Sequence, residues 1–134
     1  MKREPSLTGI GFFLKPFPVQ GLKSSGKENM HWFVLFVAGL LEVVWAYSMK
    51  RSEGFTILVP SAVTVGAMIA SGVLLSFAMR ALPLGTAYSV WTGIGAVGSF
   101  VVGLAVLGEP ATPMRIAAAT LIVAGLLIMK LSSA

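Results

Sequence analysis

The chain has 134 residues, enough for one domain, and its composition is strongly apolar. Hydrophobic residues make up 56% of it, and the mean hydropathy is +0.88. Charged residues make up only 11%, against about 25% in an average soluble protein. The chain therefore has too few polar groups to cover the surface of a soluble protein, which excludes a soluble enzyme. The net charge of +5 comes from basic residues that lie between long apolar runs. That placement indicates the loop charges of a membrane protein and no nucleic-acid partner.

Cysteine is absent and His31 is the single histidine of the sequence. Neither a disulfide framework nor a thiolate nucleophile is therefore possible, and one histidine does not make a metal site. We expect no metal and no cofactor.

Residues 1–29 differ in composition from the rest of the chain. They hold five of the ten basic residues and three of the seven prolines. A signal peptide is not indicated, because Lys15, Pro16 and Pro18 interrupt the only candidate apolar core and no small-residue cleavage site follows. We expect a disordered N-terminal extension, which is either a genuine cytoplasmic tail or a stretch upstream of a true start at Met30.

Residues 30–134 contain four apolar blocks, which are 32–49, 54–79, 81–108 and 111–131. Each is close to the roughly 20 residues that a membrane-spanning helix needs. The last block contains Arg115 and Lys130 near its ends, where long basic side chains reach the interface. The connections are only a few residues long, so successive helices must be antiparallel neighbours. We predict an all-α membrane protein with four transmembrane helices in one domain.

Glu42 lies near the middle of the first block. A carboxylate at the bilayer midplane costs several kcal/mol unless it is paired, protonated or hydrated, and such residues are usually functional. Burial favours the neutral acid, whereas a bound cation favours the carboxylate, so a proton and a cation compete for one site. That competition is the core of an exchanger. The alternative is a permanently neutral carboxyl hydrogen-bonded to another helix.

Aromatic residues lie at helical spacing near this carboxyl. Trp45 is one turn from Glu42 and is either a flat wall for a planar cation or a packing residue that faces lipid. Tyr88 and Trp91, in the middle of the third block, need partners for their OH and NH groups, and the Glu42 carboxylate is the obvious acceptor. Ser71 is a weaker candidate, because a serine in mid-span more often bonds a carbonyl of its own helix than a ligand.

Small residues indicate two further features. Gly93 and Gly95 weaken the third helix at its centre, so a bend there would let it adopt two shapes. Ala118 and Gly125 lie seven residues apart in the fourth helix and form a small-residue seam. The seam suits close contact with a second copy, and it is equally compatible with packing inside one chain.

Four helices with one carboxylate do not enclose a polar pathway, because side chains fill the centre of so small a bundle. An oligomer is therefore expected. With Met30 as the start, two basic residues lie on one side of the membrane and three on the other, so the charges select no orientation. Both orientations can then insert, which permits an antiparallel pair with two Glu42 side chains facing each other. Counting residues 1–29 gives seven basic residues against three and removes this ambiguity.

From Met30 onward the sequence resembles the small multidrug resistance family of four-helix proton-coupled exporters. The matching stretches are Gly-Leu-Leu-Glu-Val at 39–43, Ser-Glu-Gly-Phe-Thr at 52–56 and Leu-Pro-Leu-Gly-Thr-Ala-Tyr-Ser-Val-Trp-Thr-Gly at 82–93. The stretch Glu-Val-Val-Trp-Ala at 42–46 resembles the guanidinium exporter subtype, because broad-spectrum exporters generally lack a Trp at the position of Trp45.

This resemblance implies an antiparallel homodimer in the bacterial inner membrane that exchanges guanidinium outward for protons inward. Glu42 would be the shared proton and substrate site, surrounded by Trp45, Ser71, Tyr88 and Trp91. The bend at 93–95 would be the conformational switch, and the fourth helix, with Ala118 and Gly125, the dimer seam.

Three alternatives stay open. The chain could export a broad range of quaternary ammonium compounds, although Trp45 argues against this by narrowing the site. It could instead be an accessory membrane subunit that transports nothing, which leaves Glu42 hard to explain. Finally, it could pair with a paralogue as a heterodimer.

Overall fold

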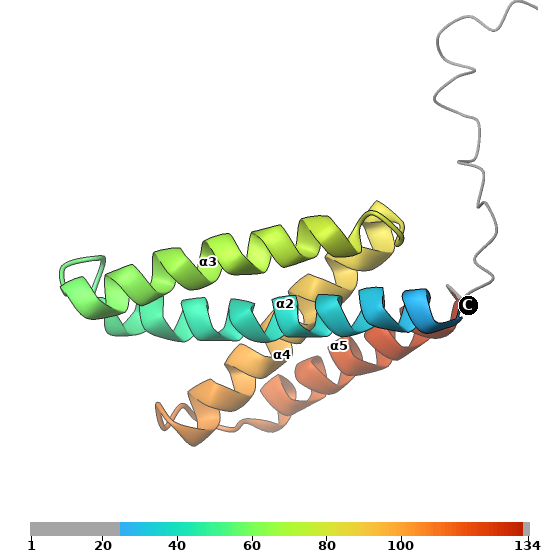
Figure 1. Cartoon of the computed structure of the whole chain (residues 1–134). Helices are drawn as coiled ribbons and strands as arrows, with labels where there is room; N and C mark the ends of the chain where they lie inside the picture. Colours follow the sequence, from blue (N-terminus) through green and yellow to red (C-terminus); the bar gives the residue numbers. More distant parts are fainter. Residues whose placement is uncertain (1–24, 133–134) are drawn as a thin grey trace, which may run out of the picture.

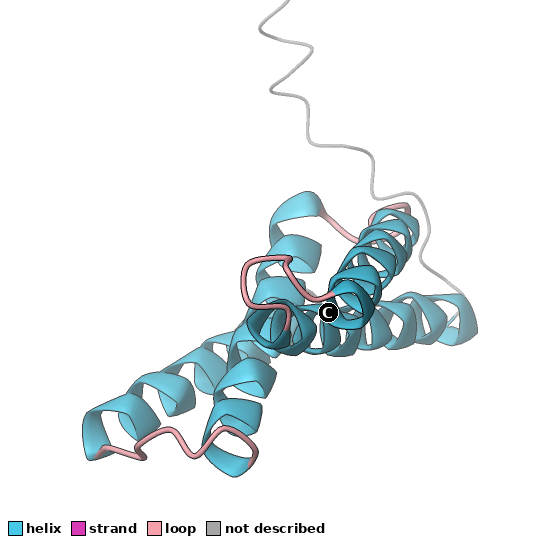
Figure 2. Ribbon diagram, turned by 90° about the vertical axis from the view of Figure 1, so that its left-hand side faces the viewer, coloured by secondary structure: helices cyan, strands magenta, loops and turns pink. Residues whose placement is uncertain are grey.

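The computed structural model describes residues 25–132, which form four α-helices joined by short turns (Figure 1). The helices are α2 (Ser25–Arg51), α3 (Leu58–Ala78), α4 (Leu84–Ala105) and α5 (Pro113–Ser132). No strand occurs within 25–132, and Figure 2 shows only helices and loops in that range. All four helices are long and apolar enough to cross a membrane. The predicted all-α transmembrane fold is therefore confirmed.

The first helix begins earlier than the composition indicated. α2 starts at Ser25, so residues 25–29, which we expected to be disordered, continue the helix. Glu28 lies in the first turn, where a negative charge complements the positive end of the helix dipole. The rest of the expected extension, residues 1–24, lies outside the described residues, as do residues 133–134.

Two proline positions explain where later helices begin. Pro83 directly precedes α4 with an extended backbone (ψ 146°), and Pro113 is the first residue of α5. Proline suits the first turn of a helix because the amide it lacks would have no partner within the helix. Both turns therefore reverse the chain within a few residues.

The turn between α2 and α3 contains three successive residues with positive φ, namely Glu53 (48°), Gly54 (74°) and Phe55 (66°). Ser52 is fully buried and holds this turn from inside. Its hydroxyl donates to the carbonyl of Met49 at 2.7 Å and accepts from the amide of Phe55 at 3.1 Å. The Ser-Glu-Gly-Phe-Thr motif thus builds a tight reversal that returns α3 along α2.

Helix α2 lies at the centre of the bundle. It runs alongside α3 and crosses α4, whereas the backbone of α5 comes close to that of α4 alone (Figure 1). The buried apolar core is small and consists of Leu35, Ala38, Leu75, Ala78, Leu82, Ala87 and Val90. Most other apolar side chains point outward, as lipid-facing residues of a membrane helix do.

Glycines allow α2 and α4 to cross closely. A Cβ atom added to Gly39 would lie 2.6 Å from Cγ2 of Ile94, and one added to Gly98 would overlap the side chain of Val43. Such contacts are closer than side chains allow, so a side chain at either position would force Ile94 or Val43 to move. The close crossing brings the middle of α2, where Glu42 lies, directly against α4.

Candidate functional site at the crossing of α2 and α4

The Glu42 side chain lies against Gly95 of α4, where an added Cβ would overlap the carboxyl group. Its Oε2 atom is buried and has no hydrogen-bond partner among residues 25–132. Buried polar atoms are nearly always paired, so an orphaned carboxyl oxygen calls for a missing partner. A proton or a bound cation would each satisfy that requirement.

Trp45, one turn further along α2, shows the same feature. Its indole Nε1 is buried and, within the described chain, has no acceptor. An unsatisfied donor therefore lies within one helical turn of an unsatisfied carboxyl oxygen. Two orphaned polar atoms so close together are typical of a site built for a ligand rather than for packing.

Ser71 connects three helices. It is fully buried, its hydroxyl donates to the carbonyl of Ala38 on α2 at 2.7 Å, and it accepts from Nε1 of Trp91 on α4 at 2.9 Å. Ser71 thus bonds a carbonyl of α2 rather than one of its own helix, which is the commoner partner of a serine in mid-span. The expectation that Glu42 accepts the Trp91 N–H is wrong, because in this conformation the Ser71 hydroxyl does so. Ala38 and Glu42 are one turn apart, so this link supports the carboxyl from the neighbouring turn.

Tyr88 packs against Trp91 and lies closer to the surface of the chain. Its ring lies 5.4 Å from the ring of Trp91, centroid to centroid, at a tilted angle of 53°. Tyr88 is 52% exposed, so one chain alone does not enclose this side of the site. The structure thus brings Ser71, Trp91 and Tyr88 into one connected group.

Gly93 and Gly95, the two candidate hinge residues, each allow a side chain of another helix to approach α4 closely. Gly95 accommodates the Glu42 carboxyl, and a Cβ added to Gly93 would lie 2.5 Å from Cδ2 of Leu126 on α5. α4 is helical without interruption from Leu84 to Ala105. A bend at these glycines stays a prediction about a second conformation.

The small residues of α5 face open space. No residue of α5 is buried, and a Cβ added to Gly125 would meet no atom within 4 Å. Gly125 lines a groove of about 450 Å³ between α4 and α5, and Ala118 lines a second groove of about 190 Å³ between the same helices. Packing inside the chain therefore leaves the predicted seam uncovered.

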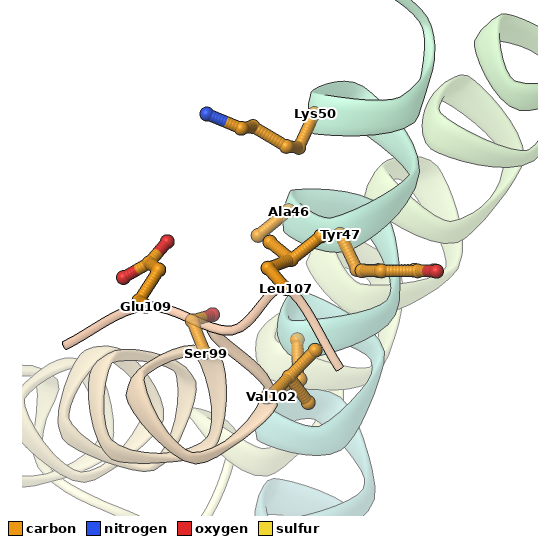
Figure 3. A pocket seen from close by; sticks show the side chains of 8 residues that line it. Ala46, Tyr47, Lys50, Ser99, Val102, Leu107 and Glu109 are labelled. Atoms are coloured by element: carbon orange, nitrogen blue, oxygen red, sulfur yellow. The ribbon is translucent and has the colours of Figure 1, made fainter. Parts of the chain in front are cut away.

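A separate pocket of about 180 Å³ lies between α2, α4 and the loop that leads to α5 (Figure 3). Lys50 and Glu109 point into the same space there, and Val43, the neighbour of Glu42, contributes to its wall. Glu109 also accepts a hydrogen bond from Arg115 at 2.8 Å, and the Arg115 guanidinium lies 5.3 Å from the ring centroid of Phe100.

From the sequence we placed Arg115 at the membrane interface and assigned it no partner, so its pairing with Glu109 was missed. The two residues are six positions apart across a turn, a spacing that no helical or strand periodicity marks. No group of three or more acidic, histidine or cysteine side chains that could hold a metal ion occurs between residues 25 and 132.

Comparison with known proteins identifies the family. The model of the Small Multidrug Resistance protein family matches residues 30–122, which include Glu42, Trp45, Ser71, Tyr88 and Trp91. The chain belongs to the small multidrug resistance family. Members of this family are transporters, so the protein is a multi-pass membrane transporter rather than an enzyme, and the family resemblance of the sequence is confirmed.

Within the small multidrug resistance family, several curated relatives are similar over most of this chain. The guanidinium exporter of Citrobacter freundii is 58% identical over 104 residues, which cover 78% of this chain and 99% of the relative. The guanidinium exporter of Escherichia coli K12 is 57% identical with the same coverage. The guanidinium exporter of Salmonella typhimurium is 58% identical.

Proposed function

We propose that this chain exports guanidinium in exchange for protons, by alternating access at Glu42. The observation that carries the proposal is the pair of buried, unpartnered polar atoms one helical turn apart on α2, Oε2 of Glu42 and Nε1 of Trp45. The relatives named guanidinium exporters, with 57–58% identity, support the same substrate.

The chemistry of guanidinium suits these residues. The ion is planar and presents pairs of N–H donors that a carboxylate accepts two at a time. The faces of Trp45 and Trp91 attract a planar cation through the negative potential of their rings. Sodium offers neither a flat face nor N–H donors, so a site of this composition discriminates against it.

The dimer is part of this proposal. Half-exposed Tyr88 and the uncovered face of α5 leave the site of one chain incomplete. A second copy, inverted in the bacterial inner membrane and joined through Ala118 and Gly125, would complete it and bring two Glu42 carboxyls together. Two such carboxyls titrate as a coupled pair rather than as independent groups.

Transport by reconstituted protein tests the proposed function. Liposomes with an acidic interior should accumulate radiolabelled guanidinium, because each entering cation exchanges for protons that leave down their gradient. A protonophore should abolish the accumulation. Uptake of tetraethylammonium without guanidinium would favour the broad-spectrum exporter, and failure to move either cation would favour the accessory subunit.

Replacing Trp45 or Trp91 by Leu should weaken guanidinium binding by about 1 to 2 kcal/mol each, the value of a desolvated cation–π contact. Trp32→Leu is the matched control, because Trp32 lies near the start of α2, away from Glu42. Its ring lies 5.5 Å from Nζ of Lys130 on α5. Isothermal titration calorimetry measures the guanidinium affinity of the wild type and of the three variants. Equal affinity in the wild type, Trp45→Leu and Trp91→Leu would return both tryptophans to a packing role.

Orientation gives a prediction that needs no substrate. A chain starting at Met30 should place its C-terminus on both sides of the inner membrane, because two basic residues against three supply almost no bias. Two lysines added after Ser133 should drive it to one side. C-terminal reporters that are active only in the cytoplasm or only in the periplasm measure both states, and a purely cytoplasmic signal from the unmodified chain would contradict dual topology.

A further inference from the structure

The missing side chain of Gly95 leaves a small space on α4 that the Glu42 carboxyl occupies, and we call this space the seat. A Cβ added to Gly95 would overlap Cδ of Glu42 and lie 2.5 Å from its Oε2. The φ angle of Gly95 is not positive, since Gly54 and Gly108 are the glycines with that feature between residues 25 and 132. Space, rather than backbone freedom, is therefore what glycine supplies here, and every other residue type would fill it.

The seat suits a neutral carboxyl better than a charged one. Oε2 of Glu42 is buried with no hydrogen-bond partner in the described chain, and amides in mid-helix already bond carbonyls of their own helix. A carboxylate moved into such a place loses its hydration without compensation, whereas a protonated acid loses far less.

No charged side chain of residues 25–132 forms an ion pair with the Glu42 carboxyl, because the ion pair in that range joins Arg115 and Glu109, and Lys50 and Glu109 line the separate pocket beyond Val43. α3 carries no titratable side chain along its whole length, and the one such residue of α4 is Tyr88, seven positions from Gly95. On α2 itself the closest cationic side chain along the sequence is Lys50, eight positions from Glu42.

We infer that Gly95 is a positioning residue whose missing side chain seats the protonated carboxyl of Glu42, and that the charged carboxylate leaves this seat to bind guanidinium. The inference rests on the proposed function and deepens it. Proton and substrate then exclude each other by position as well as by charge. The proton released when the carboxyl leaves the seat passes to water on the side to which the site is open.

Neighbouring glycines of α4 supply matched controls. Gly98 also lies in the crossing with α2, but its added Cβ would meet Val43 and not the carboxyl. Gly93 lies against Leu126 of α5. Alanine at any of the three positions raises helix propensity and adds one methyl group, so only the neighbour that it meets differs.

The first experiment measures guanidinium binding by tryptophan fluorescence across pH. Gly95→Ala should retain guanidinium at acid pH at which the wild type has already released it, because the seat for the protonated form is filled. A tenfold gain in relative affinity at that pH is about 1.4 kcal/mol. Gly98→Ala and Gly93→Ala should keep the wild-type pH dependence. Identical pH dependence in all four proteins would overturn the inference and leave Gly95 as a hinge or packing residue.

A second experiment uses the wild type and does not depend on guanidinium transport. Solid-state NMR of protein labelled at Glu Cδ and Gly Cα should show a Glu42–Gly95 cross-peak at acid pH, identified by its absence in Glu42→Gln. The cross-peak should weaken at alkaline pH and vanish with guanidinium. A cross-peak of constant intensity would overturn the inference even if transport is confirmed. Failure of guanidinium transport with a pH-dependent cross-peak would instead refute only the proposed function.

Discussion

Glu42→Gln should abolish the accumulation of guanidinium against its gradient while leaving the four helices folded. The amide matches the carboxyl in shape but neither carries the charge that holds the cation nor releases a proton in the working pH range. The variant therefore loses the charge-assisted hydrogen bonds to guanidinium. The coupling between the proton gradient and the guanidinium gradient is lost with them. The measurement is uptake by acid-loaded liposomes, with circular dichroism and gel filtration to confirm the fold.

The matched control for this variant is Glu53→Gln. Glu53 is an exposed glutamate in the turn between α2 and α3, outside the helix crossing, so its variant should transport like the wild type. Proton-driven accumulation by Glu42→Gln would show that the assignment of Glu42 is wrong. Loss of accumulation in both variants would point to a general loss of charge or folding rather than to one site.

Guanidinium affinity should fall as the pH drops through the titration range of the Glu42 pair. Each proton bound to the pair removes the negative charge that the cation needs, so competition by one proton lowers the apparent affinity by up to about tenfold per pH unit. Tryptophan fluorescence of purified protein in detergent across the pH range measures this directly. Binding of guanidinium that does not change with pH would rule out the antiport mechanism.

The same titration should separate guanidinium from tetraethylammonium. A site built to accept paired hydrogen bonds discriminates strongly against a cation that has no N–H donor. Tetraethylammonium can interact only by charge and apolar contact, so we expect it to bind more weakly. Tighter binding of tetraethylammonium than of guanidinium would favour the broad-spectrum exporter.

Much of the fold was predictable because a membrane imposes a simple rule on the sequence. Every backbone polar group in lipid must be paired within its own helix, so four apolar blocks of sufficient length already imply four helices. Glu42 stood out for the same reason, as a carboxyl in mid-span. The start of α2 at Ser25 was not predictable from composition, because polar residues extend a helix into water without changing its apolar pattern.

The residues of the candidate site were predictable, but their partners were not. The type and spacing of Glu42, Trp45 and Trp91 along their helices follow from the sequence alone. That Ser71 bonds Ala38 and Trp91, and that the Glu42 carboxyl lies against Gly95, depends on the rotation and depth at which α2, α3 and α4 meet.

The rotation of each helix and the depth of the crossing are set when the helices pack together and cannot be derived from the sequence of one helix. Small residues such as Gly39 and Gly98 permit a close crossing, yet the sequence does not say which side chain of the facing helix will occupy the space they leave. The sequence by itself therefore determined the number of membrane-spanning helices and the place of the buried carboxyl. Only the tertiary structure decided which groups that carboxyl meets, because contacts between helices arise from residues far apart in the chain.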